Sequence, residues 1–180
     1  METKNKKLPN RHSIRLANYD YSSDGWYFVT TCTHKGEHLF GTITDGKMKL
    51  NQYGIIVQEC WNDLTNHYSN IVLHDFCIMP NHFHGIIEIN NDKGTIRAGL
   101  KPAPTDLDNV NFALSEIVRG FKTFSSQKIN RLRQSAGESV WQRNYFEHVI
   151  RSEKSYYTLV NYIHNNAVRW SLDKLNNMGE

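Results

Sequence analysis

The sequence predicts an α+β fold, a single domain with a central antiparallel sheet and packed helices. Strand-like and helix-like segments are interspersed along the chain, which is typical of this class. Two apolar runs near its centre, residues 71–80 and 81–90, are joined by a Pro-Asn turn and are most simply an antiparallel pair. The length of 180 residues suits one domain over 1–180 and leaves little room for a second.

The first third of the chain carries signals for an arm, a strand, a hairpin and a helix. Residues 1–15 are basic and predict a flexible arm. The segment WYFVTTCT, residues 26–33, is aromatic and β-branched, which favours a strand. An Asp-Gly turn signal within residues 42–51 predicts a short hairpin. From residue 54 to 67 the apolar side chains recur near helical spacing, which predicts an amphipathic helix.

The remaining elements follow the central pair of strands. Residues 91–108 are polar and rich in Gly and Pro, so they predict a long loop, because a Pro-Ala-Pro sequence cannot lie inside a helix. Apolar positions at helical spacing predict a long helix over 109–133. Residues 141–150 have strand-like composition, and 152–166 predict a final helix with Ser152 as its N-cap.

Composition and cysteine use exclude several classes of protein. A hydrophobic content of 39% is too high for a disordered chain. No segment approaches the roughly 18 apolar residues of a transmembrane helix, and the basic N-terminus lacks the apolar core of a signal peptide. Cys32, Cys60 and Cys77 lie far apart, which suits reduced thiols in a cytoplasmic protein. The net charge of +3 permits nucleic acid as a partner without requiring it.

Two histidines in IMPNHFHGIIEI, residues 78–89, raise the question of a metal site. Alternate residues of a strand share a face, so His82 and His84 lie on one face and the core-like set that includes Phe83 lies on the other. The histidine face must therefore look outward or into a cleft, where two imidazoles can share a divalent cation. Two ordinary histidines at the surface or core edge remain about as plausible on periodicity alone. A cupin motif, HxHxxxE ending at Glu88, is disfavoured by the long helical patterns, because cupins are all-β.

The final predicted helix offers a candidate nucleophile beside a candidate ligand. Tyr156 falls in its apolar stripe, and Tyr162 lies on the flank of that stripe. Asn166, four residues further, projects from nearly the same side. A phenol can act as a nucleophile, and an amide oxygen can bind a metal. Tyr156 and Tyr157 are competing candidates, and Tyr162 taken alone is more simply an ordinary boundary residue with its hydroxyl in water.

A basic stretch provides candidate contacts for nucleic acid. Ser, Thr and aromatic residues are interleaved with cations over residues 115–133, a mixture typical of a groove that follows a phosphate backbone. A solvated helix face has much the same composition. The candidate DNA-binding residues are Arg119, Lys122, Lys128, Arg131, Arg133 and, further on, Arg143.

Several blocks taken together resemble the HUH transposases with one catalytic tyrosine, the IS200-like transposases, and most closely the REP-associated tyrosine transposases. The resemblance covers nearly the whole chain. The segments that carry it are RHSIRLANYDYSSDGWYFVTTCTHKGEHLFG, CIMPNHFHGIIEI, LSEIVRGFKTFSSQKIN and VWQRNYFEHVIRSEKSYYTLVNYIHNN. The last block contains the family's motif YIxxN, which opens with its nucleophilic tyrosine. Ala167 departs from the proline that commonly follows the asparagine in the REP-associated branch.

The resemblance implies a fold, a reaction and a set of site residues. The fold is the ferredoxin-like or RRM-like HUH domain. The reaction is cleavage and rejoining of single-stranded DNA through a covalent 5′-phosphotyrosine, with Mg²⁺ or Mn²⁺ as cofactor. Tyr162 is then the nucleophile, and His82, His84 and Asn166 are the metal ligands. The implied partner is single-stranded or hairpin DNA, bound by a monomer or a homodimer. Two other functions stay open, a catalytically silent DNA-binding module and a metal hydrolase of small molecules.

Overall fold

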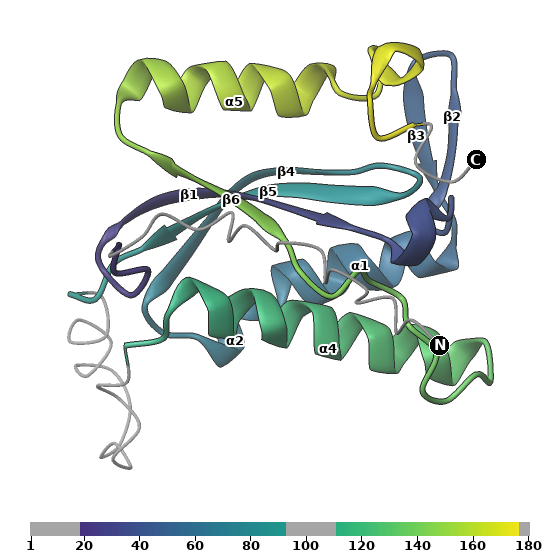
Figure 1. The fold of residues 1–180 in the computed structure, drawn as a ribbon, viewed down its shortest axis with the longest axis horizontal. Helices are drawn as coiled ribbons and strands as arrows, with labels where there is room; N and C mark the ends of the chain where they lie inside the picture. Colours follow the sequence, from purple (N-terminus) through teal and green to yellow (C-terminus); the bar gives the residue numbers. More distant parts are fainter. Residues whose placement is uncertain (1–18, 93–110, 177–180) are drawn as a thin grey trace, which may run out of the picture.

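The structure, a computed structural model, describes residues 19–92 and 111–176 (Figure 1). The arm predicted at residues 1–15 and most of the loop predicted at 91–108 lie outside the described residues. Where the chain is described, no helix is long and apolar enough to span a membrane.

A four-stranded sheet forms the centre of the fold. Its strands are β1 (Gly25–Cys32), β4 (Ile71–Ile78), β5 (His82–Ile89) and β6 (Phe146–Ile150). They lie in the order β4-β5-β1-β6, and every neighbouring pair is antiparallel. Strand β5 therefore lies between β1 and β4, which are connected through helical segments on one side, as in the split βαβ arrangement of ferredoxin-like folds. The predicted class, with an antiparallel sheet and packed helices, is confirmed.

The helices divide between the two faces of this sheet (Figure 1). Helices α1 (Gln52–Asn62), α2 (Leu64–His67) and α4 (Leu114–Leu132) cover one face. Helix α5 (Glu153–Asn165) lies on the opposite face by itself. The Ser152 hydroxyl accepts a hydrogen bond from the Ser155 amide at 3.2 Å, so the predicted N-cap of α5 is confirmed.

A separate hairpin packs at one end of the sheet. Strands β2 (Gly41–Thr44) and β3 (Lys47–Leu50) are antiparallel, as the Asp-Gly signal predicted. Asp45 and Gly46 have φ of 52° and 68°, the left-handed values that a two-residue type I′ turn requires at both positions. Two short 3₁₀ turns, η1 (His34–Gly36) and η3 (Trp170–Leu172), complete the described elements.

Three predicted boundaries were wrong. Helix α1 begins two residues earlier than expected, because the Asn51 side chain accepts hydrogen bonds from the amides of Tyr53 and Gly54 and caps it. Helix α4 begins at Leu114 and not at residue 109. The Ala113 amide, just before it, donates to the Glu116 carboxylate at 3.0 Å and so caps the helix. The strand expected over 141–150 begins only at Phe146; before it, Trp141 makes an isolated bridge to Thr33.

The alternation along β5 separates two apolar clusters. On the α1 and α4 side, the Phe83 ring packs 4.6 Å from Trp61 and 4.9 Å from Phe121, measured between ring centroids. On the α5 side a smaller cluster joins Ile86 to Ile163. The core-facing set predicted from the strand period is thus confirmed.

Gly85 of β5 has no room for a side chain. A Cβ atom there would lie 2.6–2.8 Å from side-chain atoms of Trp61 and Phe83. We therefore expect Gly85→Ala to lower the free energy of unfolding by about 1–3 kcal/mol, because a packed core resists extra volume. Adding Trp61→Phe to this variant should recover part of the lost stability. Urea denaturation of the two single variants and the double variant should give an interaction energy of at least about 0.5 kcal/mol between the two positions. A Gly85→Ala variant as stable as the wild type would contradict this packing.

Candidate functional site

The two histidines of β5 lie beneath helix α5. His82 and His84 are 0% and 3% exposed, and their ring centroids are 4.6 Å apart. Sequence reasoning left open whether this face looks outward or into a cleft. In the structure it is covered, because α5 and the segment that follows it pack over the sheet (Figure 1).

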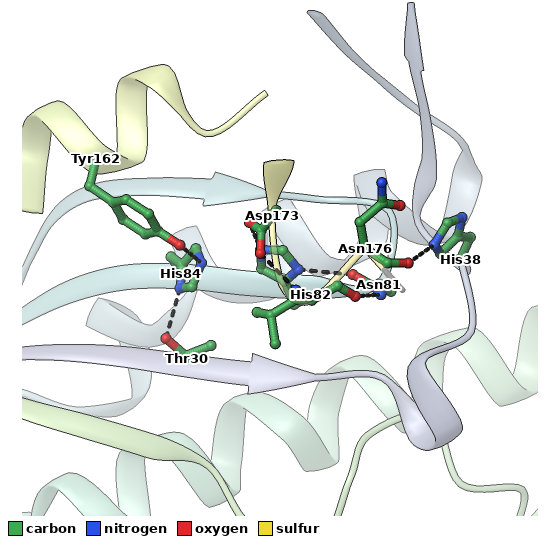
Figure 2. A network of polar contacts seen from close by, with 9 residues as sticks. Thr30, His38, Asn81, His82, His84, Tyr162, Asp173 and Asn176 are labelled. Atoms are coloured by element: carbon green, nitrogen blue, oxygen red, sulfur yellow. Dashed lines mark hydrogen bonds and ion pairs between the residues drawn. The ribbon is translucent and has the colours of Figure 1, made fainter. Parts of the chain in front are cut away.

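His84 contacts both a β1 hydroxyl and the predicted nucleophile (Figure 2). Its Nδ1 lies 2.7 Å from Thr30 Oγ1, the residue directly opposite it in the β1–β5 register. Its Nε2 lies 3.3 Å from the Tyr162 hydroxyl. The Phe28 ring stacks on the imidazole with centroids 5.2 Å apart. The predicted tyrosine and histidine therefore meet within one chain.

His82 is held in one tautomer by its neighbour. Its Nδ1 lies 2.9 Å from Asn81 Oδ1, while Asn81 Nδ2 donates to the Leu175 carbonyl at 2.6 Å (Figure 2). Because the amide nitrogen is committed to that carbonyl, Asn81 presents its oxygen, and His82 Nδ1 must carry the proton. The lone pair of His82 is then on Nε2, which is buried without a hydrogen-bond partner. Metal-binding histidines are oriented in this way by a partner on their other nitrogen.

Asn166 and Asp173 close the site around that nitrogen. Asn166 is 2% exposed, and neither of its side-chain polar atoms makes a hydrogen bond of good geometry. Its side chain lies close enough to His82 and Tyr162 to alter the pKa of both. The Asp173 Oδ2 atom lies 3.9 Å from His82 Nε2. Each of these buried polar atoms is a potential metal ligand.

Burial sets the charge state of the site. Loss of solvation lowers the pKa of His82 to about 4, although Asp173 and Asn166 oppose that change. Burial, with a smaller contribution from His82, holds the pKa of His84 well below its ordinary value. Burial also raises the pKa of Tyr162, and the negative charge of Asp173 adds to that rise. At neutral pH the site therefore contains two neutral imidazoles and a protonated phenol.

The stability of the metal-free protein should fall as the pH is lowered below neutrality. In the unfolded chain His82 binds a proton near its ordinary pKa of 6.5, whereas in the folded protein it does so near 4. Between these pH values the unfolded state binds more protons than the folded state. The contribution of neutral His82 to the free energy of unfolding is therefore complete above pH 6.5 and is lost as the pH falls towards 4. From pH 7 to pH 5, His82 alone should remove about 2 kcal/mol from the free energy of unfolding. Urea titrations in EDTA measure this slope, and a His82→Gln, His84→Gln double variant should flatten it; equal stability at both pH values would contradict it.

An irregularity in β4 holds α5 in place. The register between β4 and β5 shifts between Leu73 and Phe76, so two consecutive residues, His74 and Asp75, bulge from the strand. Both reach α5: His74 Nδ1 lies 3.2 Å from the Tyr156 hydroxyl, and Asp75 Oδ1 lies 2.6 Å from His164 Nε2. In a regular strand they would point to opposite faces. The bulge thus fixes α5 on either side of Tyr162.

The predicted DNA-binding cations lie on or near α4, across the sheet from Tyr162 (Figure 1). Arg119, Lys128, Arg131 and Arg143 are exposed. Lys122 instead donates to the carbonyls of residues 142, 143 and 144 at 2.5–3.2 Å. Burial lowers its pKa to about 8.

Arg133 also has local partners. Its side chain binds Asn130 at 2.9 Å and Glu138 at 3.1 Å. A hollow of about 1040 Å³ lies beside α4, and Arg119, Lys122 and Arg143 are among its lining residues. The six predicted cations therefore do not form one uniform free surface.

Two other kinds of metal site can be tested against the described residues, a cluster of three His, Cys, Asp or Glu ligands and a cupin site. Within residues 19–92 and 111–176, no three His, Cys, Asp or Glu side chains are grouped so as to hold a metal ion. Glu88, the acid of the HxHxxxE pattern, binds His74 at 3.0 Å and is not directed to the histidine pair. Together with the α+β fold, that contact excludes a cupin.

Sequence reasoning missed four participants. Thr30 and Phe28 reach His84 from β1, and nothing in their own strand pattern distinguishes them. Asn81 was noted only as a turn residue, although its position next to His82 was a usable signal. Asp173 lies in a polar segment after the last helix, where the sequence carries no motif.

Comparison with known proteins gives relatives but no matching family model. An uncharacterised protein of Haemophilus influenzae is 41% identical over 179 residues, which cover 97% of this chain and 98% of that protein. A second H. influenzae protein, provisionally classed as a REP-associated tyrosine transposase, is 24% identical over 159 residues, covering 86% of this chain and 77% of the relative. The solved structure of a REP-associated tyrosine transposase bound to a REP hairpin is similar in fold, with a TM-score of 0.57, 17% identity and coverage of 91% and 77%.

Proposed function

Because the chain belongs to one family with the uncharacterised H. influenzae protein and is a distant relative of the REP-associated tyrosine transposases, we propose that it is a tyrosine transposase. In this proposal it cleaves and rejoins single-stranded DNA through a covalent 5′-phosphotyrosine, with a divalent metal. The observation that carries the proposal is the 3.3 Å approach of the Tyr162 hydroxyl to His84 Nε2, next to the second histidine of the pair.

The donor set suits Mg²⁺ or Mn²⁺. His82 Nε2 is buried and carries a lone pair, and Asn166 Oδ1 is buried without a partner, so both lack the contacts that buried polar atoms normally make. His84 Nε2 is the third donor, so the residues that would hold the cation are His82, His84 and Asn166. A bound cation supplies polarisation of the scissile phosphate and neutralisation of charge that develops on attack.

Nε2 of His84 has one lone pair, so it can accept the Tyr162 hydroxyl or bind a cation, but not both. The hydrogen bond at 3.3 Å therefore belongs to the metal-free site. A cation held by His84 Nε2 would require Tyr162 to give up this hydrogen bond, which would leave its hydroxyl available to substrate. The 37% exposure of the Tyr162 side chain leaves it accessible for that change.

The chemistry of the chain's own residues follows from this arrangement. The Tyr162 oxygen attacks the phosphorus and loses its proton to water, while the bond from phosphorus to the 3′ oxygen breaks and that oxygen takes up a proton. A 3′ hydroxyl reverses the step by attacking the phosphotyrosine, so strands are rejoined without a nucleotide cofactor. Burial and Asp173 raise the pKa of Tyr162, so the phenol is a weak nucleophile until positive charge is brought close.

The proposed partner is single-stranded or hairpin DNA. The exposed cations Arg119, Lys128, Arg131 and Arg143 are suited to phosphate contacts. Since α4 and α5 lie on opposite faces of the sheet, DNA that touches both must pass around a sheet edge (Figure 1). Lys122 and Arg133, which already bind protein groups, contribute mainly to the shape of that surface.

One observation favours the alternative of a catalytically silent DNA-binding module. In the described part of the chain, no three His, Cys, Asp or Glu side chains are grouped so as to hold a metal ion. Such a module would bind hairpins without needing a metal.

The test is adduct formation on hairpin DNA. The full-length protein is incubated with a pool of labelled hairpins that carry single-stranded flanks, in Mn²⁺ or in EDTA, and the products are separated under denaturing conditions. We expect a denaturation-resistant protein–DNA adduct in Mn²⁺ only, with the nucleotide mapped to Tyr162 by mass spectrometry. Binding that persists in EDTA with no adduct on the hairpins that bind would favour the silent module.

A further inference from the structure

A carboxylate outside the predicted ligand set lies at the histidine pair. We propose that Asp173 is a fourth protein ligand of the divalent cation, an inference that rests on the proposed function. It requires His82, His84 and Asp173 to draw closer together on cation binding, because in the described residues they are not grouped as a metal site. Its Oδ2 atom lies 3.9 Å from His82 Nε2 (Figure 2). Its side chain is 11% exposed, so the contact is not a solvent-screened surface pair.

The separation of these two atoms suits a shared cation. Ligands about 2.1 Å from an octahedral ion are roughly 3.0 Å apart when adjacent and about 4.2 Å apart when opposite. The 3.9 Å between His82 Nε2 and Asp173 Oδ2 lies between these two separations, and it is too long for a hydrogen bond. The two atoms are therefore close enough for one cation to reach both after a shift of less than about 1 Å.

The local structure directs Asp173 toward His82. Its other oxygen, Oδ1, accepts the Leu175 amide at 2.8 Å, which leaves Oδ2 turned to the imidazole. The Leu175 carbonyl accepts the Asn81 amide at 2.6 Å, and Asn81 is the residue that orients His82. Trp170, just before this turn, places its ring 5.8 Å from His82. The segment that follows α5 is thus tied to the residue that sets the histidine tautomer.

Charge supports the same assignment. The proposed set of His82, His84 and Asn166 is neutral, and Asp173 adds the one formal negative charge among the four side chains. After burial, which is the larger cause, that charge raises the pKa of Tyr162 and of Cys32 on β1. The carboxylate therefore lies close enough to the site for its charge to act on these groups. Mg²⁺ and Mn²⁺ favour oxygen ligands, and carboxylates most of all.

The experiment measures metal binding directly on the full-length protein. Free Mn²⁺ is followed by electron paramagnetic resonance during titration of wild type, Asp173→Asn, Asp63→Asn and a His82→Ala, His84→Ala double variant. We expect Asp173→Asn to raise the Kd for Mn²⁺ at least about 10-fold and the double variant to abolish binding. Asp63 is the matched control, because its carboxylate also faces a histidine, His67 at 3.0 Å, but lies on the other face of the sheet. Asp63→Asn should leave the Kd unchanged.

Competing explanations give different results. Ni²⁺ prefers imidazole, so its Kd should rise less than that of Mn²⁺ in Asp173→Asn. Equal weakening of both metals would indicate a displaced segment and would overturn the assignment, as would a Mn²⁺ Kd that changes less than about 3-fold. Loss of binding in the histidine variant alone would overturn the Asp173 assignment and leave the proposed function standing. Binding that none of the variants affects would overturn both.

Discussion

Replacing Tyr162 with Phe is expected to abolish the covalent adduct, with strand cleavage reduced at least about 10³-fold. The phenolic oxygen is the atom that would bond to phosphorus, and the variant removes only that oxygen. Cleavage is measured on labelled hairpin DNA in Mn²⁺ under single-turnover conditions. Since Tyr162 is 37% exposed and its hydroxyl makes one long hydrogen bond, stability should change little.

A second measurement on the same variant separates chemistry from folding. Removing the hydroxyl frees His84 Nε2, so Mn²⁺ should bind as tightly as before or up to about 10-fold more tightly, the equivalent of one net hydrogen bond. Tyr157→Phe is the matched control, because Tyr157 lies on the same helix and is 56% exposed. A Tyr162→Phe protein that forms as much adduct as wild type would show that another group is the nucleophile.

Replacing His84 with Ala is expected to reduce Mn²⁺-dependent cleavage by about 10²-fold or more, because it removes a ligand and the partner of Tyr162. The buried imidazole also contacts Thr30 and Phe28, so the variant should lose some stability as well. Circular dichroism and urea denaturation show whether it remains folded. His67→Ala, a half-exposed histidine on the opposite face, should cleave at the wild-type rate. Cleavage by His84→Ala at the wild-type rate and Mn²⁺ dependence would remove His84 from the site.

The bulge of β4 adds two polar contacts to the docking of α5. His74 and Asp75 bind the helix at Tyr156 and His164, on both sides of the residue proposed as nucleophile. Helix α5 would otherwise rest on a small cluster around Ile86 and Ile163. The polar links add to this apolar contact, and the same helix presents Tyr162 to His84.

The sequence by itself determined the class of fold and the type of most elements. Period-2 alternation in β5 placed His82 and His84 on one face and Phe83 on the core face, because a pleated strand allows no other arrangement. The Asp-Gly turn and the Ser152 cap were equally local, since each depends on residues within four positions. Helical spacing identified the core stripe of α5, and it placed Tyr162 and Asn166 on the flank.

Only the tertiary structure decided what surrounds the histidines. Thr30 faces His84 through the strand register across 54 residues of sequence, and Asp173 approaches His82 from the segment after the last helix. The bulge at His74 and Asp75 arises from pairing between two strands. The lowered pKa of His82 arises from coverage by elements distant in sequence. Periodicity reports which face a side chain shares with its neighbours in the chain; it carries no information about which remote residue packs against that face or how much water it excludes.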